Sequence, residues 1–523
     1  MERRWRAGPI ATFLIVGCIV FVVLPQISVM SRYRTERWQP GWAVLNQQTD
    51  VRRPIEDVVD NDRSTAEEDE AEETYLMDSN QLEARPIEAD SRSTVVRLEK
   101  DTERFFQAIG SGAALFVKYG AYRGGSNTFA VVGLGAKALY DFAEPEFECY
   151  WVPLSAVRSR HNPTIQQALR IQKGHAYPML PDMDYGRVYI TVVVNCTFAE
   201  PVGTATDDRG GQLVLYATHG DGQGKPPVRF VALTEKQLAT DAARLEPPVP
   251  HQFAYCSPPL YGELHPARMR EWLAHHIRLF GPRSHFHLHD AGAINAEVRA
   301  VIEPWSRLGF VSVQNVTEQE KYDGYYHNKF LIMNDCLHRT RFKADWTFFF
   351  DMDEYLYVLP DSSLQSLTTQ SYANLSMLQF NQVRMSDYVC QAPQAVDSDC
   401  RWAIEDLLFA DKDSDYEKKA PKYAVQGRAV FAVGLHKSEA ELGHMQGEQG
   451  WAWWPKIRYY HYQSILPKSK DRNCYEYVNY TTPPFSFQDH TLELDTSMVY
   501  MASLAKKFEV DQIGELQIQY SPV

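Results

Sequence analysis

The spacing of hydrophobic positions divides the 523-residue chain into two globular regions. In residues 94–246, short apolar runs such as Gln212–Ala217 alternate with turn-forming residues, and no long amphipathic helix separates them. This pattern predicts a β-sandwich. The proline cluster Pro247–Pro250 marks a boundary, and in residues 247–523 strand-like runs alternate with helical spacings. That alternation predicts an α/β domain with a parallel sheet of the nucleotide-binding type.

The first hundred residues of the predicted α/β domain should contain three helices and three strands. Pro266 suits the first turn of a helix, and Gly281 suits its end. The expected elements are a helix over 266–280, a strand over 284–289, a helix over 295–307, a strand over 310–316, a helix with Tyr326, Phe330, Met333 and Leu337 on one face, and a strand over 346–350.

An uncharged segment precedes both globular regions. Residues 8–30 carry no charge, and their densest apolar run extends from Ile10 to Leu24. Such a segment is long enough to span a bilayer. Residues 1–30 are therefore expected to form a cytosolic tail and a transmembrane signal anchor, with a cleaved signal peptide as the alternative. Arginines lie on both sides of the segment, so its flanking charges leave the orientation open.

The negative charge of the chain is concentrated after this segment. The formal net charge is −14, and residues 50–90 hold 15 Asp or Glu residues against 4 Arg. Because like charges repel and few aromatic residues are present, residues 31–93 are predicted to be a disordered stem. The rest of the chain is nearly neutral, which argues against a nucleic-acid partner.

A pair of aspartates follows the last strand of that series. Five residues, Trp346–Phe350, read as a buried strand and lead directly into Asp351-Met352-Asp353-Glu354. In an open α/β sheet, ligands bind beyond the carboxyl ends of the strands, and hard oxygen ligands suit Mg²⁺ or Mn²⁺. Other Asp-x-Asp tripeptides occur in the chain, but only this one follows a hydrophobic strand. The position predicts a metal site that holds a diphosphate.

Several longer segments resemble one family in the same order along the chain. The segments are Tyr255–Gly262, Arg270–His276, Ser284–Gly292, Tyr322–Asn328, Asn334–Arg339, Phe349–Tyr355, Gly434–His436 and Ile457–Tyr462. Together they are similar to plant β-1,4-galactan synthases of glycosyltransferase family 92, over roughly residues 255–480. More weakly, the β-rich region resembles the carbohydrate-binding-type module that precedes the catalytic domain in that family.

The resemblance implies a complete functional description. It implies a nucleotide-sugar transferase (GT-A-like) fold, a divalent cation (Mn²⁺ or Mg²⁺), UDP-galactose as donor and β-1,4-galactan chains as acceptor. It also implies a type II Golgi membrane protein with a lumenal catalytic domain. A homodimer is one alternative for the oligomeric state. The alternatives are a family member acting on another glycan, an anchored carbohydrate-binding protein with an inactive transferase fold, and a metal-dependent hydrolase. A metal-dependent hydrolase is expected to gather ligands for two metal ions, and the sequence lacks such a cluster of ligands.

The same resemblance assigns candidate roles at the metal and donor sites. Asp353 is expected to bind the metal, and Asp351 to share the metal or hold the donor ribose, while Glu354 orients the site. A late histidine usually completes the metal shell in this fold, and His461 is preferred to His436. Residues expected to contact the nucleotide are Ser257, Tyr261, Arg268, Asp290, His327, Asn334, Asp335 and Arg339. Each can instead serve as a cap, an internal hydrogen bond or a surface charge.

Acid–base chemistry and acceptor binding are assigned to a later part of the chain. The resemblance implies inversion at the sugar, which needs a base on the acceptor side. Glu405 and Asp406 both lie among apolar and aromatic residues, where partial burial favours basicity. Glu405 is the preferred base because the segment resembles family members more at Glu405 than at Asp406, and the alternative is an acid on a helix surface. Candidate stacking surfaces for sugar rings, or alternatively core residues, are Trp451, Trp453 and Trp454.

Sequons and cysteines agree with a lumenal location. Acceptor tripeptides begin at Asn195, Asn315, Asn374 and Asn479. Cys390 and Cys400 flank a polar loop that a disulfide would close. Seven cysteines follow the apolar segment, and seven is odd, so at least one thiol is expected to stay free. Cys336, on a predicted buried helix, is the choice, although all seven being reduced core residues is the alternative.

Overall fold

The computed structural model describes two parts of the chain that together belong to one compact unit, residues 90–523. The described residues run from 105 to 516, except for 112–114, 139–140, 143–144, 159–169, 179–186, 205–209, 220–225, 237–244, 387–388, 392–401, 413–419, 442–447, 453–455, 464–475 and 480–483. The predicted anchor and stem lie outside this range. Among the described helices, none is long and apolar enough to cross a membrane.

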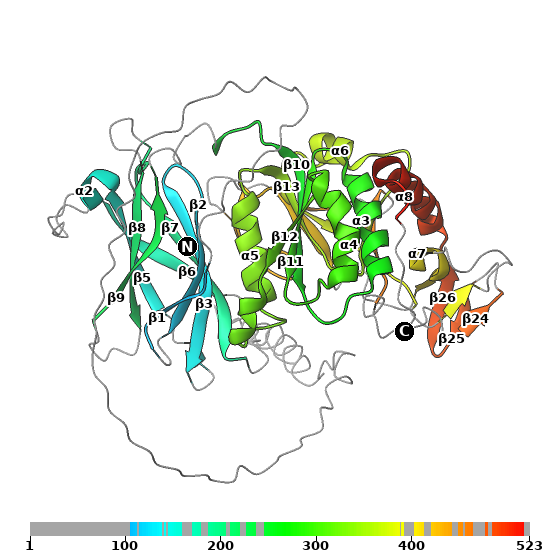
Figure 1. Cartoon of the computed structure of the whole chain (residues 1–523), viewed down its shortest axis with the longest axis horizontal. Helices are drawn as coiled ribbons and strands as arrows, with labels where there is room; N and C mark the ends of the chain where they lie inside the picture. The colour runs from blue at the N-terminus through cyan, green and yellow to red at the C-terminus, as the bar shows by residue number, and fades with distance from the viewer. Residues whose placement is uncertain are drawn as a thin grey trace, which may run out of the picture. The chain divides into compact units, whose positions relative to one another are not determined.

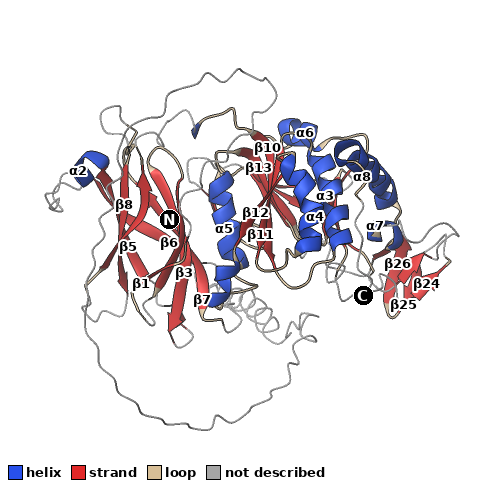
Figure 2. Cartoon of the chain, viewed as in Figure 1, coloured by secondary structure: helices blue, strands red, loops and turns tan. Residues whose placement is uncertain are grey.

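The first part, which we call the β-module, is an antiparallel sheet in the order β1-β2-β3-β7-β6-β5-β8-β9, with β4 beside β3 (Figure 2). Its strands are β1 Gln107–Ile109, β2 Phe116–Arg123, β3 Thr128–Ala138, β4 Asp141–Phe142, β5 Pro145–Pro153, β6 Arg170–Pro178, β7 Tyr189–Thr197, β8 Gly211–His219 and β9 Val228–Glu235, with the short helix α2 Leu154–Arg158 after β5.

The sheet of the β-module folds back on itself around an apolar core. Strand β2, next to the edge strand β1, meets the opposite edge strand β9, since Lys118 Nζ donates to the Ala232 carbonyl at 3.1 Å and Arg123 pairs with Glu235 at 2.5 Å. One continuous sheet therefore supplies both layers, whereas the sequence pattern predicted a sandwich without indicating this continuity. A disulfide between Cys149 of β5 and Cys196 of β7 crosses the core.

The second part is an α/β domain built on a seven-stranded sheet in the order β12-β11-β10-β13-β19-β15-β22. The first four strands are parallel, β19 runs antiparallel to both of its neighbours, and β22 is parallel to β15. The bounds are β10 His251–Leu260, β11 Ser284–Asp290, β12 Val311–Asn315, β13 Ala344–Phe349, β15 Leu375–Phe380, β19 Lys422–Val425 and β22 Glu448–Trp451. The predicted parallel sheet is thus present but continues into a mixed half.

Helices cover both faces of this sheet. Figure 1 shows α3 and α4 on one face and α5 on the other. The helices are α3 Pro266–Phe280, α4 Ala296–Arg307, α5 Lys329–Thr340 and, packed against α3, α8 Ser497–Ile513. The predicted bounds of α3 and α4 agree closely with the structure. Tyr326, which was placed on the α5 face, instead precedes that helix in a left-handed backbone conformation.

Smaller elements complete the domain. A three-stranded sheet, β14-β23-β16, continues from the main sheet and comprises Glu354–Val358, Ile457–His461 and Gln382–Arg384. The others are η4 Thr317–Lys321, α6 Leu364–Ser366, η5 Leu367–Ser371, β17 Val389–Gln391, α7 Ala403–Asp406, β18 Phe409–Asp411, β20 Val430–Val433, β21 Ser438–Glu441, β24 Glu476–Val478, β25 Phe485–Phe487 and β26 His490–Leu494.

The cysteine pairing differs from the expectation. Cys336 of α5 forms a disulfide with Cys256 of β10, so the prediction that Cys336 stays free is wrong. The odd number of cysteines required at least one unpaired thiol, but it could not indicate which cysteines the fold brings together. Cys256 and Cys336 are 80 positions apart in the sequence. Cys390 is disulfide-bonded as well. Cys400 lies outside the described residues, so its pairing with Cys390 stays a prediction.

Helix α5 is buried between the sheet and the β-module. Every residue from Phe330 to Thr340 is buried. Apolar residues of β2, β3 and β7 share one core cluster with Phe330, Leu331 and Ile332. The Tyr122 hydroxyl of β2 donates to Asp335, whose second carboxylate oxygen accepts from Arg339 Nε at 2.9 Å. The β-module thus packs against one side of α5.

The buried Asp335–Arg339 pair should contribute strongly to stability. Its two side chains are 1% and 6% exposed, and removing one partner leaves an uncompensated buried charge. We expect Asp335→Ala to lower the free energy of unfolding by about 3–5 kcal/mol, measured by chemical denaturation. The matched control is Glu303→Ala, which breaks the exposed pair with Arg307 at the same helical spacing. The control should cost less than about 1 kcal/mol. Equal effects would contradict this role of the pair.

Candidate active site

The acidic turn Asp351–Glu354 connects the two sheets of the α/β domain. Strand β13 ends at Phe349, and β14 begins at Glu354, whose backbone N–H donates to the Asp351 carbonyl at 3.2 Å. Met352 is buried in the core, whereas the side chains of Asp351 and Asp353 are 29% and 11% exposed. The turn therefore presents carboxylates at the carboxyl end of a central strand, as the sequence predicted.

Three potential metal ligands meet at this turn. One ligand atom each from Asp353, Glu354 and His461 lies within 4.8 Å of the others. His461 arrives because β14 and β23 pair antiparallel with Glu354 directly opposite His461. Its Nε2 lies 3.5 Å from Asp353 Oδ2, and Gln382 contacts its Nδ1 at 2.8 Å. Burial opposes protonation of His461, but the charge and hydrogen bond of Asp353 and the charge of Glu354 together outweigh it and raise the pKa.

This set of side chains fits a divalent cation. Two carboxylates and an imidazole offer the oxygen and nitrogen donors that Mn²⁺ accepts, and a contact such as that of Gln382 orients a ligating imidazole. Asp353, Glu354 and His461 would hold the ion. Glu354, which the sequence analysis treated as an orienting residue, is placed inside this group.

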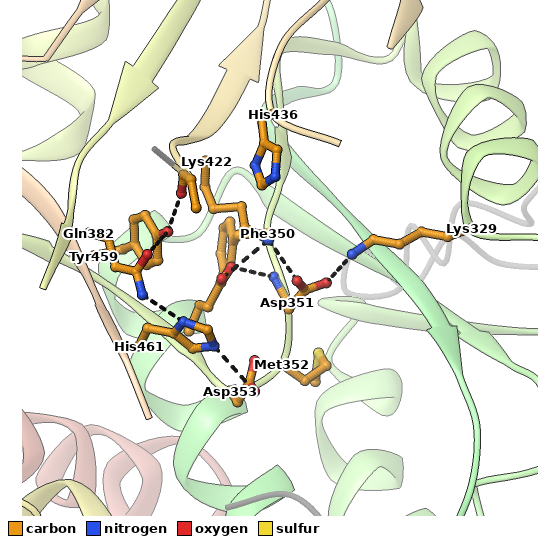
Figure 3. Close-up of polar contacts among 12 residues, drawn as sticks. Lys329, Phe350, Asp351, Met352, Asp353, Gln382, Lys422, His436, Tyr459 and His461 are labelled. Carbon is orange, nitrogen blue, oxygen red and sulfur yellow. Dashed lines mark hydrogen bonds and ion pairs between the residues drawn. The ribbon is translucent and has the colours of Figure 1, made fainter. Parts of the chain in front are cut away.

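Asp351 lies outside the group, between two lysines (Figure 3). Its carboxylate oxygens accept from Lys329 Nζ and Lys422 Nζ, each at 2.6 Å. Burial alone would raise the pKa of Asp351, but the two ammonium groups outweigh it and hold the pKa well below its usual range. Lys422 also lies 3.2 Å from Glu354. The sequence analysis missed both lysines, because no motif marks them.

His436, the second histidine candidate, contacts the main chain instead. Its Nδ1 lies 3.0 Å from the Pro421 carbonyl. Burial, and then the positive charge of Lys422, lower the pKa of His436 to about 4. The imidazole lies beside Lys422 (Figure 3) but is not part of the three-residue group.

Three residues that were predicted to contact the nucleotide sugar instead form hydrogen bonds or an ion pair within the fold. The Ser257 hydroxyl is fully buried and donates to the Pro258 carbonyl at 2.7 Å. Arg268 pairs with the buried Glu271 in the first turn of α3. Asp290 accepts from the backbone N–H groups of Gly292 and Ile294 and so shapes the loop after β11.

The polar residues of α5 that were predicted to contact the nucleotide are buried between the helix and its neighbours. Asn334 donates to the Phe330 and Val433 carbonyls and accepts from the Val433 N–H. Asp335 and Arg339 form the ion pair described above, and Arg339 also contacts His289 at 2.8 Å. These contacts fix α5 against β20 and β11, and they give the three side chains structural roles.

Tyr261 and His327 remain close to the acidic turn. Their rings stack with centroids 3.9 Å apart, and Tyr261 is 43% exposed. Burial, together with the charges of Asp351 and Asp353, raises the pKa of Tyr261 to about 12. Tyr326, His327 and Asn328 all have left-handed φ values, at 44°, 54° and 59°. Such backbone strain in non-glycine residues occurs at functional sites when the surroundings impose it.

Glu405 has structural partners in α7. Its carboxylate accepts from the Trp402 N–H in a capping box and pairs with Lys506 of α8. Asp406 ends the same short helix. These contacts account for Glu405 without catalysis, and the assignment of Glu405 or Asp406 as the base stays a prediction.

The remaining predicted residues lie on the surface or outside the described range. Trp451, in the edge strand β22, is 50% exposed, whereas Trp453 and Trp454 are outside the described residues. The four sequon asparagines are exposed or half-buried, namely Asn195, Asn315, Asn374 and Asn479. Their surface positions leave the glycosylation prediction open.

Comparison with known proteins identifies the family. Residues 251–507 match the profile of Glycosyltransferase family 92. The chain is 38% identical over 423 residues to galactan beta-1,4-galactosyltransferase GALS1 of Arabidopsis thaliana, covering 79% of each chain. It is 40% identical over 421 residues to GALS2 and 38% identical over 421 residues to GALS3 from the same plant, covering 79% of this chain and 76% and 79% of theirs. The chain belongs to glycosyltransferase family 92 and is a glycosyltransferase.

Proposed function

We propose that this protein transfers galactose from UDP-galactose to the growing end of β-1,4-galactan, with inversion at the sugar and with the help of a divalent cation. The observation that carries the proposal is the group Asp353, Glu354 and His461 at the end of a central strand. Similarity to three galactan galactosyltransferases supports the choice of donor and acceptor.

The proposed reaction is a single in-line displacement. The acceptor hydroxyl oxygen forms a bond to the galactose anomeric carbon while the bond to the diphosphate breaks and UDP leaves. A base, for which we retain Glu405, takes the hydroxyl proton. A bound cation would supply positive charge for the diphosphate. Asp353, Glu354 and His461 provide the ligands, and the ring of Tyr261 offers an exposed surface for the nucleotide or the sugar.

We place the α/β domain in the Golgi lumen, behind a type II membrane anchor. The Cys149–Cys196 and Cys256–Cys336 disulfides support an oxidising compartment. The exposed sequon residues Asn315, Asn374 and Asn479 are accessible to glycosylation. Protease added to sealed vesicles should leave the domain intact, and its digestion would reverse the topology.

The first prediction about the chemistry of the site is the reaction itself. Incubation of the full chain with UDP-galactose, Mn²⁺ and a β-1,4-galactan oligosaccharide should lengthen the oligosaccharide. Each added residue should carry a β linkage, measured by NMR of the product. If galactan is never lengthened while another glycan is, the acceptor is wrong. If another sugar nucleotide serves and UDP-galactose does not, the donor is wrong.

The second prediction concerns the cation. Chelation should abolish transfer, Mn²⁺ should restore it, and Asp353→Ala should reduce turnover by ~10²-fold or more, as expected for loss of a main electrostatic stabiliser. Asp361→Ala, which removes an exposed carboxylate shortly after β14, is the matched control and should retain activity. Full activity in excess chelator would exclude the metal assignment.

The third prediction separates catalysis from capping at Glu405. Glu405→Gln keeps the capping hydrogen bond but removes the base, so turnover should fall by about 10²–10⁴-fold while UDP affinity stays constant. Lys506→Met breaks the ion pair between Lys506 and Glu405 but leaves the Glu405 carboxylate, so the turnover of this variant should stay near wild type. Equal, small effects of both variants would show that Glu405 has only a structural role.

A further inference from the structure

Two lysines converge on the Asp351 carboxylate. Lys329 is the first residue of α5 and Lys422 the first residue of β19, so two elements whose first residues are 93 positions apart (422 − 329) supply them. The side chains of Lys329 and Lys422 are 13% and 6% exposed, whereas that of Asp351 is 29% exposed. The carboxylate therefore covers two ammonium groups at the solvent side of the site.

The location of the three side chains is unusual for a purely structural ion pair. They line a small pocket together with Pro258, Phe350 and other residues, and the Asp351 side chain stays 29% exposed. Lys422 also contacts Glu354, so the lysine pair is continuous with the metal-type group. Desolvating two ammonium groups is costly, and Asp351 is the one carboxylate that both lysines share, with Glu354 as a second partner of Lys422 alone. A ligand with more negative charge would match the pair better.

We propose that Lys329 and Lys422 bind the diphosphate of the nucleotide donor and that Asp351 occupies their ammonium groups when the donor is absent. The inference rests on the proposed function and adds to it two residues with a defined ligand. Lysine binds phosphate as a compact point charge. A diphosphate carries more negative charge than a carboxylate and can contact both lysines at once. The same contacts would stabilise the charge that develops on UDP as the bond to the sugar breaks.

The backbone around both lysines is held in place before any ligand binds. The left-handed residues Tyr326–Asn328 lead directly into Lys329, and the Asn328 side chain donates to the carbonyls of Gln319 and Tyr322. Lys422 lies in β19, which is paired on both sides within the sheet. Preorganised charges of this kind need little rearrangement when negative charge appears.

The test compares UDP with uridine, which lacks the phosphates, by calorimetric titration of the full chain in chelator and again with Mn²⁺. Wild-type protein in chelator should bind UDP more tightly than uridine. Lys329→Met should weaken UDP binding by about tenfold or more and leave uridine binding unchanged. The matched control Lys321→Met removes an exposed lysine that pairs with Glu318, and it should alter neither affinity.

Asp351→Asn should change the affinity for UDP in the opposite direction. Because the variant removes the group that competes for both lysines, UDP should bind more tightly than to wild type in chelator. The inference is overturned if Lys329→Met leaves UDP binding unchanged, if it weakens uridine binding equally, if Asp351→Asn fails to strengthen UDP binding, or if wild type binds UDP with Mn²⁺ but does not distinguish UDP from uridine in chelator. Absence of UDP binding to wild type in both conditions would instead overturn the proposed donor.

Discussion

The antiparallel pairing of β14 with β23 is the interaction on which the candidate site depends. It sets Glu354 directly opposite His461, although more than 100 positions separate them in the chain. The turn that precedes β14 has only enough residues to pass from one sheet to the next, so its carboxylates cannot move away from the strand end. A slip of one residue in this pairing would move the imidazole to the other face of the small sheet.

Charge balance then decides what surrounds the turn. Three carboxylates within four residues repel one another unless positive groups approach them. The structure places them in two overlapping sets. Asp351 is compensated by Lys329 and Lys422, whereas Asp353 lies with His461, and Glu354 belongs to both sets because it contacts Lys422 and is one of the three potential metal ligands. This division gives the two aspartates of one motif different chemical environments, although the motif alone suggests equivalent roles.

Much of the site follows from local sequence, and the rest depends on tertiary contacts. The apolar strand before Asp351 and the helical spacing after Pro266 were sufficient to predict the strand end and α3. Sequence could not distinguish two roles for the polar residues of α5, because a buried helix needs internal partners for Asn334 and Asp335, and such residues resemble ligand contacts in sequence. Lys329 and Lys422 gave no signal, since neither residue belongs to a motif and only the fold places them together.

The burial of α5 also bears on how the two parts of the protein function together. The helix carries Lys329 at one end and contacts the β-module through Phe330, Leu331 and Asp335. Without the β-module, these residues would face water, and the position of Lys329 would lose its support. Similarity to the relatives extends over 421–423 residues and so reaches well beyond the 251–507 range of the family profile. The β-module is therefore part of the structure that positions the site, whether or not it also binds sugar.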